Sequence, residues 1–198
     1  MTIAAPYRTL AEFTADLDRI VRANTNGAVD ARAIVDETKP HFERLLSDTS
    51  WLDPKFRIPA EGRIANYMLA KAPDNSWSVV STVWWPGYST PVHDHLIWGL
   101  VGVYEGVERE ERYQRLDDGS RPGFAELREV ETAFNRPVSI SHLVPPDEDI
   151  HLIHNPTDDQ PSYSIHIYGG SLDGVLRHQY DLETGEIKEF RSKYNIAC

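Results

Sequence analysis

The sequence predicts a mostly β protein, a sandwich or small barrel that is preceded by a helical segment. From about residue 63 onward, short runs of β-branched and aromatic residues alternate with turn clusters, which is typical of such folds. Residues 8–46 differ, because their apolar residues recur at helical spacing. No repeat, low-complexity tract or linker divides the 198 residues. We therefore expect one domain, residues 1–198, with a helical preface in 1–60 and a β-barrel in 61–198.

Two helices are expected before the barrel. The first spans about residues 8–23 and carries one apolar stripe, made of Leu10, Phe13, Leu17, Ile20 and Val21. The second spans about residues 29–46, where Asp30 is placed to cap the N-terminus and Pro40 predicts a break or a kink. We expect both helices to pack on the outside of the barrel.

The strands of the barrel are expected where β-rich runs are bounded by turn residues such as Pro86-Gly87. The clearest runs are residues 76–85, 100–104, 139–144, 163–168 and 175–181. The acidic run from Glu108 to Arg112 is expected to be a solvated strand or hairpin.

The composition limits the classes of function. A net charge of -11 without a basic cluster argues against nonspecific nucleic-acid binding, and an anionic ligand would need a local cation. No apolar run approaches the ~18 residues of a membrane helix, and residues 1–6 show no secretory leader pattern. The single cysteine, Cys198, cannot form an intramolecular disulfide, which fits a cytoplasmic protein. We expect a small-molecule partner; the oligomeric state is left open.

Histidines carry the main chemical signal. His93 and His95 lie two residues apart in a strand-like segment, so both imidazoles point to the same side. Two converging imidazoles suit iron, zinc, copper or nickel. A second segment, about fifty residues later, holds His151 and His154. The sequence therefore predicts a metal site. The remaining His41, His142 and His178 are expected to be surface or hydrogen-bonded structural residues.

The spacing of these segments resembles the two motifs of the cupin superfamily. The first reads G-x5-H-x-H-x3-G-x6-G from Gly87 to Gly106, with Gly99 where cupins usually carry a glutamate. The second, from Pro146 to Asn155, has Glu148 where a glycine is usual. The resemblance implies a double-stranded β-helix, which is a jelly-roll-like barrel. It also implies that His151, and not His154, completes a three-histidine site.

A row of polar residues follows on one expected strand. Ser164, His166 and Tyr168 alternate with apolar neighbours, so they share one face, which we expect to be the barrel interior. Buried side chains of this kind must satisfy their hydrogen bonds internally, which a chain from Ser164 through His166 to Tyr168 achieves. A serine-hydrolase triad is not expected, because no nucleophile elbow is present and no acid is placed to orient the histidine.

Three histidines in cupin spacing, followed by S-x-H-x-Y thirteen residues after the third, resemble the thiol dioxygenases. The resemblance covers about residues 63–191. It implies a mononuclear non-haem Fe(II) centre, one per subunit, that uses dioxygen to oxidise a thiol to a sulfinic acid. His93, His95 and His151 would then hold the iron, and Ser164, His166 and Tyr168 would be the catalytic row.

Within that family the chain is most similar to bacterial 3-mercaptopropionate dioxygenases. Mammalian cysteine dioxygenases have a cysteine near Gly99, crosslinked to the tyrosine of the row, and this chain has none there. Tyr67 stands where their substrate-binding arginine is expected, with Arg63 nearby. The bacterial enzymes carry that arginine eleven residues beyond the histidine of the row, which is Arg177 here. We also expect Trp98 to wall the substrate pocket.

Arg177 is suited to fix a carboxylate, because a guanidinium can hold one bidentately. The expected substrate is 3-mercaptopropionate. Cysteine comes second, since no acidic residue is clearly placed for its ammonium group, although His154 and Glu148 lie close in sequence. Mercaptosuccinate would require Arg63 to face the pocket as well.

Two alternatives come from other classes of protein. One is a cupin hydrolase or isomerase with zinc or manganese, in which the metal activates water or polarises a substrate. The other is a ligand-binding cupin without catalysis. The imidazole ligands alone do not decide between them.

Overall fold

The computed structural model describes residues 5–194. Two expectations fall at least partly outside this range, namely the lack of a leader pattern at the N-terminus and the unpaired Cys198. No helix among the described residues is long and apolar enough to cross a membrane.

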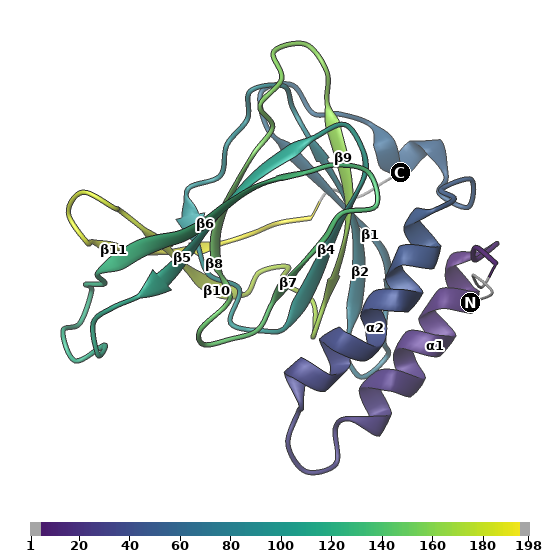
Figure 1. Ribbon diagram of the computed structural model, residues 1–198, viewed down its shortest axis with the longest axis horizontal. Coiled ribbons are helices and arrows are strands. Elements are labelled where there is room, and N and C mark those ends of the chain that lie inside the picture. Colours follow the sequence, from purple (N-terminus) through teal and green to yellow (C-terminus); the bar gives the residue numbers. More distant parts are fainter. Residues whose placement is uncertain (1–4, 195–198) are drawn as a thin grey trace.

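The described residues form two antiparallel sheets that face each other, which confirms the predicted mostly β fold (Figure 1). The five-stranded sheet has the order β1-β2-β9-β4-β7, and the six-stranded sheet has the order β11-β10-β3-β8-β5-β6. In chain order, the strands are β1 (Ile64–Lys71), β2 (Ser78–Trp84), β3 (Val92–His93), β4 (Gly99–Glu105), β5 (Glu108–Arg115), β6 (Leu127–Asn135), β7 (Ile140–Leu143), β8 (Ile150–His154), β9 (Ser162–Tyr168), β10 (Leu176–Tyr180) and β11 (Ile187–Arg191).

Two helices, α1 (Leu10–Ala23) and α2 (Ala31–Leu46), cover the outer face of the five-stranded sheet (Figure 1), and a short 3-10 turn (Pro54–Arg57) leads into β1. Asp30 caps α2 as predicted, since its side chain accepts a hydrogen bond from the amide of Ala33. Of the predicted break or kink at Pro40, the break is wrong, because α2 continues through this residue. Pro40 is exposed, and the buried side chains on either side of it, such as Phe42, keep the helix packed on the sheet.

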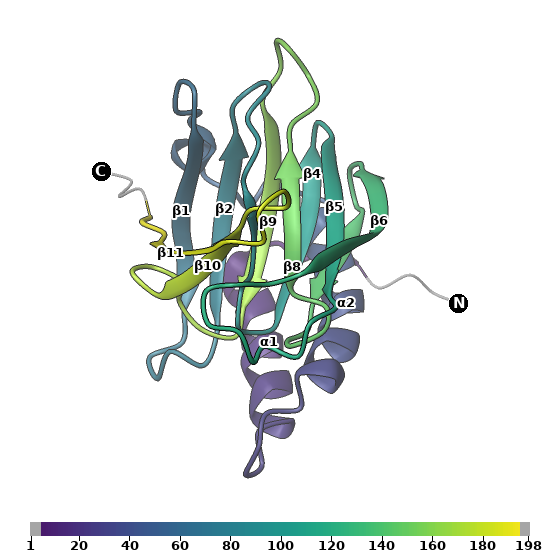
Figure 2. The ribbon, with the colours of Figure 1, turned by 90° about the vertical axis from the view of Figure 1, so that its left-hand side faces the viewer.

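Strand β9 separates the two environments of the five-stranded sheet. Ile165 and Ile167 lie in the core beneath the helices, whereas Ser164, His166 and Tyr168 alternate with them and face the second sheet. Figure 2 shows the second sheet lying in front of the five-stranded one, on the side away from the helices. The predicted polar face of this strand therefore faces the space between the sheets.

The acidic run in β5 is the main correction to the predicted strands. It is a strand, but it is not solvated: β5 lies between β8 and β6, and Glu108, Glu110 and Glu111 are all buried. The charge of the run predicted a solvent-facing surface. Glu108 and Glu110, however, lie two residues apart on the strand, so they share one face, and both are buried there.

Candidate metal centre and adjoining cavity

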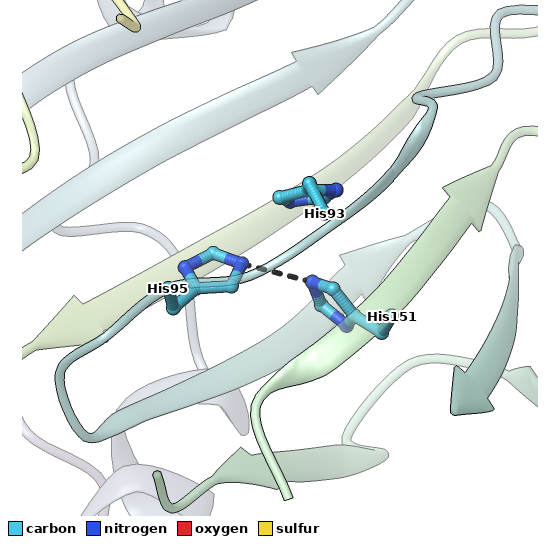
Figure 3. A group of neighbouring side chains, drawn as sticks. All are labelled: His93, His95 and His151. Atoms are coloured by element: carbon cyan, nitrogen blue, oxygen red, sulfur yellow. Dashed lines mark hydrogen bonds between the residues drawn. The ribbon is translucent and has the colours of Figure 1, made fainter. Parts of the chain in front are cut away.

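Three histidines converge between the sheets (Figure 3). His93 lies at the end of β3, His95 follows two residues later, and His151 lies on β8 directly opposite His93. One ring nitrogen of each lies within 4.8 Å of those of the other two, and Nε2 of His95 is 3.0 Å from Nε2 of His151. The three residues that the cupin resemblance selected are therefore brought together, and all are buried.

The turn after His95 is held by a buried carboxylate. Asp149 accepts hydrogen bonds from the backbone amides of His95, at 3.3 Å, and of Leu96, at 2.8 Å. Leu96 adopts a positive φ of 62°, which is costly for a residue with a Cβ and persists only where the surroundings hold it. Asp149 thus supplies part of the restraint that presents His95 to the other two imidazoles.

Two of the imidazoles are fixed in one tautomer. Nδ1 of His93 donates to the carbonyl of Pro91 at 3.0 Å, and Nδ1 of His151 donates to the carboxylate of Glu110 at 2.9 Å. Each then presents a bare Nε2 to the cluster. The pairing of His151 with a carboxylate is the arrangement that orients ligating histidines in metal sites. Glu110 was not predicted as a site residue, because the charged run from Glu108 to Arg112 indicated a solvated strand or hairpin.

The protonation states also suit a cation. Burial, together with the neighbouring charges, lowers the pKa values of His93 and His95 well below the usual value, so both imidazoles are neutral. Burial alone would raise the pKa of Glu110, but its hydrogen bond with His151 and the charges of His151 and Arg112 bring it down to about 2. Three imidazoles backed by one carboxylate could hold a divalent metal ion, and this donor set fits iron as well as zinc.

Asp94, between the first two histidines, points away from them and ties this segment to β10. Its carboxylate accepts from Nδ1 of His178 at 2.6 Å and from the hydroxyl of Tyr180 at 2.9 Å. His178 is therefore a hydrogen-bonded structural residue, as predicted. His41 and His142 are also hydrogen-bonded or ion-paired outside the cluster, with Tyr7 and Glu148 respectively.

A cavity of about 250 Å³ opens beside the histidines. Its walls come from both sheets and from the chain after β11. Besides the three histidines, they include Asn66, Val80, Trp84, Tyr88, Thr90, His166, Tyr168, Leu172, Arg177, Gln179, Phe190, Ser192 and Tyr194. None of the described residues that line it is an aspartate or a glutamate.

The predicted row on β9 is hydrogen-bonded from end to end. Ser164 Oγ lies 2.9 Å from Nε2 of His166, and Nδ1 of His166 lies 2.6 Å from the hydroxyl of Tyr168. The indole of Trp84 donates to Ser164 at 3.0 Å. Tyr168 lies at the cavity end, where its ring stacks on that of His95 with centroids 5.3 Å apart. Burial lowers the pKa of His166 to about 3 and raises that of Tyr168, so both are neutral at ordinary pH.

Arg177 is a buried cation on the opposite wall of the cavity. Its Nη1 donates to the carbonyl of Asp94 at 2.8 Å and its Nη2 to Ser192 Oγ at 2.5 Å, while its Nε has no hydrogen-bond partner in the part of the chain that the structure describes. The guanidinium stacks 4.6 Å above the ring of Phe190. No carboxylate of the described residues forms an ion pair with it. A buried positive charge without a counter-ion is costly, so this wall favours an anionic ligand.

The expectation that Trp98 walls the substrate pocket is wrong. Trp98 does not line the cavity but lies in the core beneath the helices, where its indole packs against Gly169. The physical reason is strand alternation: Trp98 immediately precedes Gly99, whose position faces Tyr168, so Trp98 falls on the helix side of the sheet. Trp98 is close to His95 along the chain, but its side chain points to the opposite side of the sheet from the histidines.

Four other residues named in the sequence analysis lie outside the cavity. Arg63 is exposed, and Tyr67 is buried with its hydroxyl donating to the carbonyl of Ile58. His154 lies beyond the cavity wall, opposite Arg109 in the sheet. Glu148 is partly exposed and paired with Arg32 and His142. None of them contributes to the walls around the histidines.

Glu108 is a second acid that the sequence analysis missed. It is fully buried, and its carboxylate lies beside Ser164, Ser162 and Trp84, at the end of the row that is farthest from the cavity. Neither of its oxygens has a hydrogen-bond partner of ordinary geometry. The alternation of Glu108 and Glu110 along one strand was the available signal, since both then share one face.

No protein-family model matches the sequence. Among solved structures, the chain is similar to a cupin 2 conserved barrel domain protein from Leptotrichia buccalis, at 17% identity and a TM-score of 0.40, covering 56% of this chain and 43% of that one. It is similar to a cupin superfamily protein from Desulfitobacterium hafniense DCB-2, at 13% identity and a TM-score of 0.40, covering 63% and 85%. It is also similar to an oxalate oxidase in complex with the substrate analogue glycolate, at 17% identity and a TM-score of 0.41, covering 58% and 54%. The chain thus spans less than half of the first of these proteins. Likeness at this level says nothing about the site, whose chemistry follows from this chain's own residues.

Proposed function

We propose that this protein is a thiol dioxygenase that converts a small carboxylate-bearing thiol, first of all 3-mercaptopropionate, to its sulfinic acid. One observation carries the proposal: a three-histidine cluster, the hydrogen-bonded Ser164–His166–Tyr168 row through His166 and Tyr168, and the buried Arg177, which has no ion-pair partner among the described residues, all border one small cavity. Each group has a task in this reaction. The thiol and dioxygen combine as RSH + O2 → RSO2H, so the thiol supplies the electrons and no further reductant is needed.

The proposed cofactor is one Fe(II) ion held by His93, His95 and His151. When bound, it would supply the redox chemistry that joins dioxygen to sulfur and would favour the thiolate form of the substrate. Glu110 keeps His151 in the ligating tautomer through Nδ1. Asp149 and Asp94 hold the polypeptide around His95 in place.

Arg177 is proposed to fix the substrate carboxylate. Its remaining N–H groups are available to the cavity, and Ser192 and Phe190 restrain its orientation. Tyr168, on the opposite side, is neutral and is proposed to donate a hydrogen bond to the reacting groups. Because Tyr168 and Arg177 are buried, the low local dielectric strengthens the polar contacts that they make to a ligand.

The walls favour 3-mercaptopropionate over the other thiols considered. Cysteine would bring an ammonium group into a cavity with no carboxylate among its described lining residues. Mercaptosuccinate would need a second cation, but Arg63 is exposed and lies outside the walls. A hydrolase or isomerase that used His166 or Tyr168 as its general base would need that group to titrate near neutrality, whereas the pKa of His166 is lowered to about 3 and that of Tyr168 is raised.

Oxygen uptake by the Fe(II)-loaded protein tests the proposal, with 3-mercaptopropionate, cysteine, cysteamine and mercaptosuccinate as substrates and the sulfinate identified by mass. We expect the fastest uptake with 3-mercaptopropionate. Replacing Arg177 with Ala should raise KM about tenfold or more through loss of a charge-assisted contact. Arg63→Ala is the matched control, because it removes an exposed arginine outside the cavity. No uptake with any thiol would refute the proposal; turnover of cysteamine equal to that of the acids would refute the role of Arg177.

A further inference from the structure

The row on β9 can carry its hydrogen bonds in two directions. His166 is neutral, so only one of its ring nitrogens bears a proton. If Ser164 donates to Nε2, then Nδ1–H donates to Tyr168, and the hydroxyl proton of Tyr168 points into the cavity. If Nε2–H instead donates to Ser164, then Nδ1 must accept from Tyr168, and the cavity faces only the lone pairs of the phenol oxygen. The direction of the row therefore depends on which neighbouring group accepts the hydrogen bond from the hydroxyl of Ser164.

Glu108 is that group by position. Its buried carboxylate lies beside Ser164, and Ser162 and Trp84 are its other polar neighbours. Within residues 5–194, Ser162 Oγ is itself buried without a hydrogen-bond partner, as are both oxygens of Glu108. An ionised Glu108 would accept the proton of Ser164. A protonated Glu108 cannot compete for it, and can itself donate to the unused lone pair of Ser164.

We infer that protonated Glu108 is a positioning residue that sets the direction of the row, so that Tyr168 donates a hydrogen bond into the cavity. Ser164 then accepts from Trp84 and donates to His166. Ionisation of Glu108 reverses the row and withdraws the donor from the cavity. The inference holds for any ligand that binds beside Tyr168 and does not depend on the reaction proposed above.

The surroundings of Glu108 keep the acid protonated. Burial raises its pKa to about 8, and the negative charge of Glu110, two residues away on the same strand, adds to this effect. The hydroxyls of Ser164 and Ser162 and the indole of Trp84 act in the opposite sense. From β9, Tyr168 is electrostatically coupled to Glu108, since the charge of Glu108 contributes to the raised pKa of the phenol. The protonated form therefore prevails at neutral pH, and the ionised form is reached in mildly alkaline solution.

The tautomer of His166 reports the direction without any need for catalysis. Nitrogen-15 NMR of the zinc-loaded, histidine-labelled protein distinguishes Nδ1–H from Nε2–H. We expect Nδ1–H at pH 6.5 and a change to Nε2–H with a midpoint of about 8. Glu108→Gln, which is neutral at every pH, should keep Nδ1–H throughout. Glu131→Gln, an exposed substitution on the neighbouring strand β6, should behave as the unaltered protein.

Two further measurements test the inference even if the Glu108→Gln variant does not fold. The carboxyl signal of Glu108 in the unaltered, carbon-13-labelled protein should titrate together with the tautomer of His166. Ser162→Ala, which removes a donor to the ionised carboxylate, should move the shared midpoint to higher pH. The inference is overturned if His166 is Nε2–H at pH 6.5, if its tautomer does not change between pH 6 and 9.5, or if Glu131→Gln alters it as Glu108→Gln does.

Discussion

Gly99 of β4 lies directly opposite Tyr168 of β9, and a Cβ at position 99 would lie 2.9 Å from Cδ1 of the tyrosine ring. The same Cβ would lie 3.1 Å from the carbonyl oxygen of Ile167. The place where the cupin pattern usually has a glutamate is thus occupied by the aromatic ring that stacks on His95. The missing carboxylate and the tyrosine row are two aspects of one packing arrangement.

Gly99→Ala should therefore displace Tyr168. The added methyl group overpacks a closed interface, which costs about 1–3 kcal/mol of unfolding free energy, and it should reduce turnover more than it changes metal content. Urea unfolding, metal analysis and steady-state kinetics of the same preparation measure the three effects. Gly123→Ala is a control of equal size, since a Cβ there meets no atom within 4 Å, although its positive φ adds some strain. Equal loss of turnover in both variants would contradict the specific role of position 99.

Glu110→Gln should weaken metal binding while leaving the three ligands in place. The amide cannot match the carboxylate as an acceptor for Nδ1–H of His151, and loss of such a partner typically lowers metal affinity about 10–100-fold. Competition titration with a chelator measures the affinity. The exposed Glu131→Gln should leave it unchanged, and unaltered affinity in Glu110→Gln would show that the carboxylate does not support the site.

Ser192→Ala should loosen the arginine without removing it. The hydroxyl accepts from Nη2 of Arg177 at 2.5 Å, and loss of such a bond is worth about 1 kcal/mol. We expect KM for a carboxylate-bearing thiol to rise about fivefold with kcat nearly unchanged. Ser47→Ala, at the exposed end of α2, is the control. A fall in kcat at constant KM would place Ser192 in the reaction step instead.

The stability of the protein should fall as the pH rises from about 4.5 to about 8 because of Glu108. Its pKa is raised on folding from 4.5 to about 8, so the folded state binds a proton that the unfolded state releases in this window. The stabilisation from Glu108 is complete below the pKa of its unfolded state and is lost as the pH rises through the pKa of its folded state. Glu108→Gln removes this dependence, so urea unfolding at pH 6 and pH 9 should give a smaller difference than in the unaltered protein. An equal difference in both would mean that Glu108 is ionised when folded.

Much of the architecture could be predicted from local patterns. The helical spacing before residue 46 and the β-rich runs after residue 63 correspond to α1, α2 and the major strands, because burial of an apolar face imposes these periods. The His93–His95 spacing and the alternation of Ser164, His166 and Tyr168 predicted shared faces, which strand geometry guarantees.

The errors arose where a side chain's environment depends on distant strands. The residues of β5 are charged, and only their position between β8 and β6 shows that Glu108 and Glu110 face the interior. Trp98 is a different case, because strand alternation places it on the helix side although it is near His95 in sequence. Composition and spacing carry no information about which neighbouring strand covers a residue.

The sequence by itself determined the class of fold, the group of residues that could hold a metal and the polar row, since these follow from periodicity and from motif resemblance. Only the tertiary structure decided what supports them. It brought Glu110 to His151, left Arg177 buried beside the cavity with no ion pair to any described residue, and put Glu108 at the far end of the row. The physical reason is that the cost of burying a charge, and the partner that offsets it, are set by contacts between strands far apart in the chain.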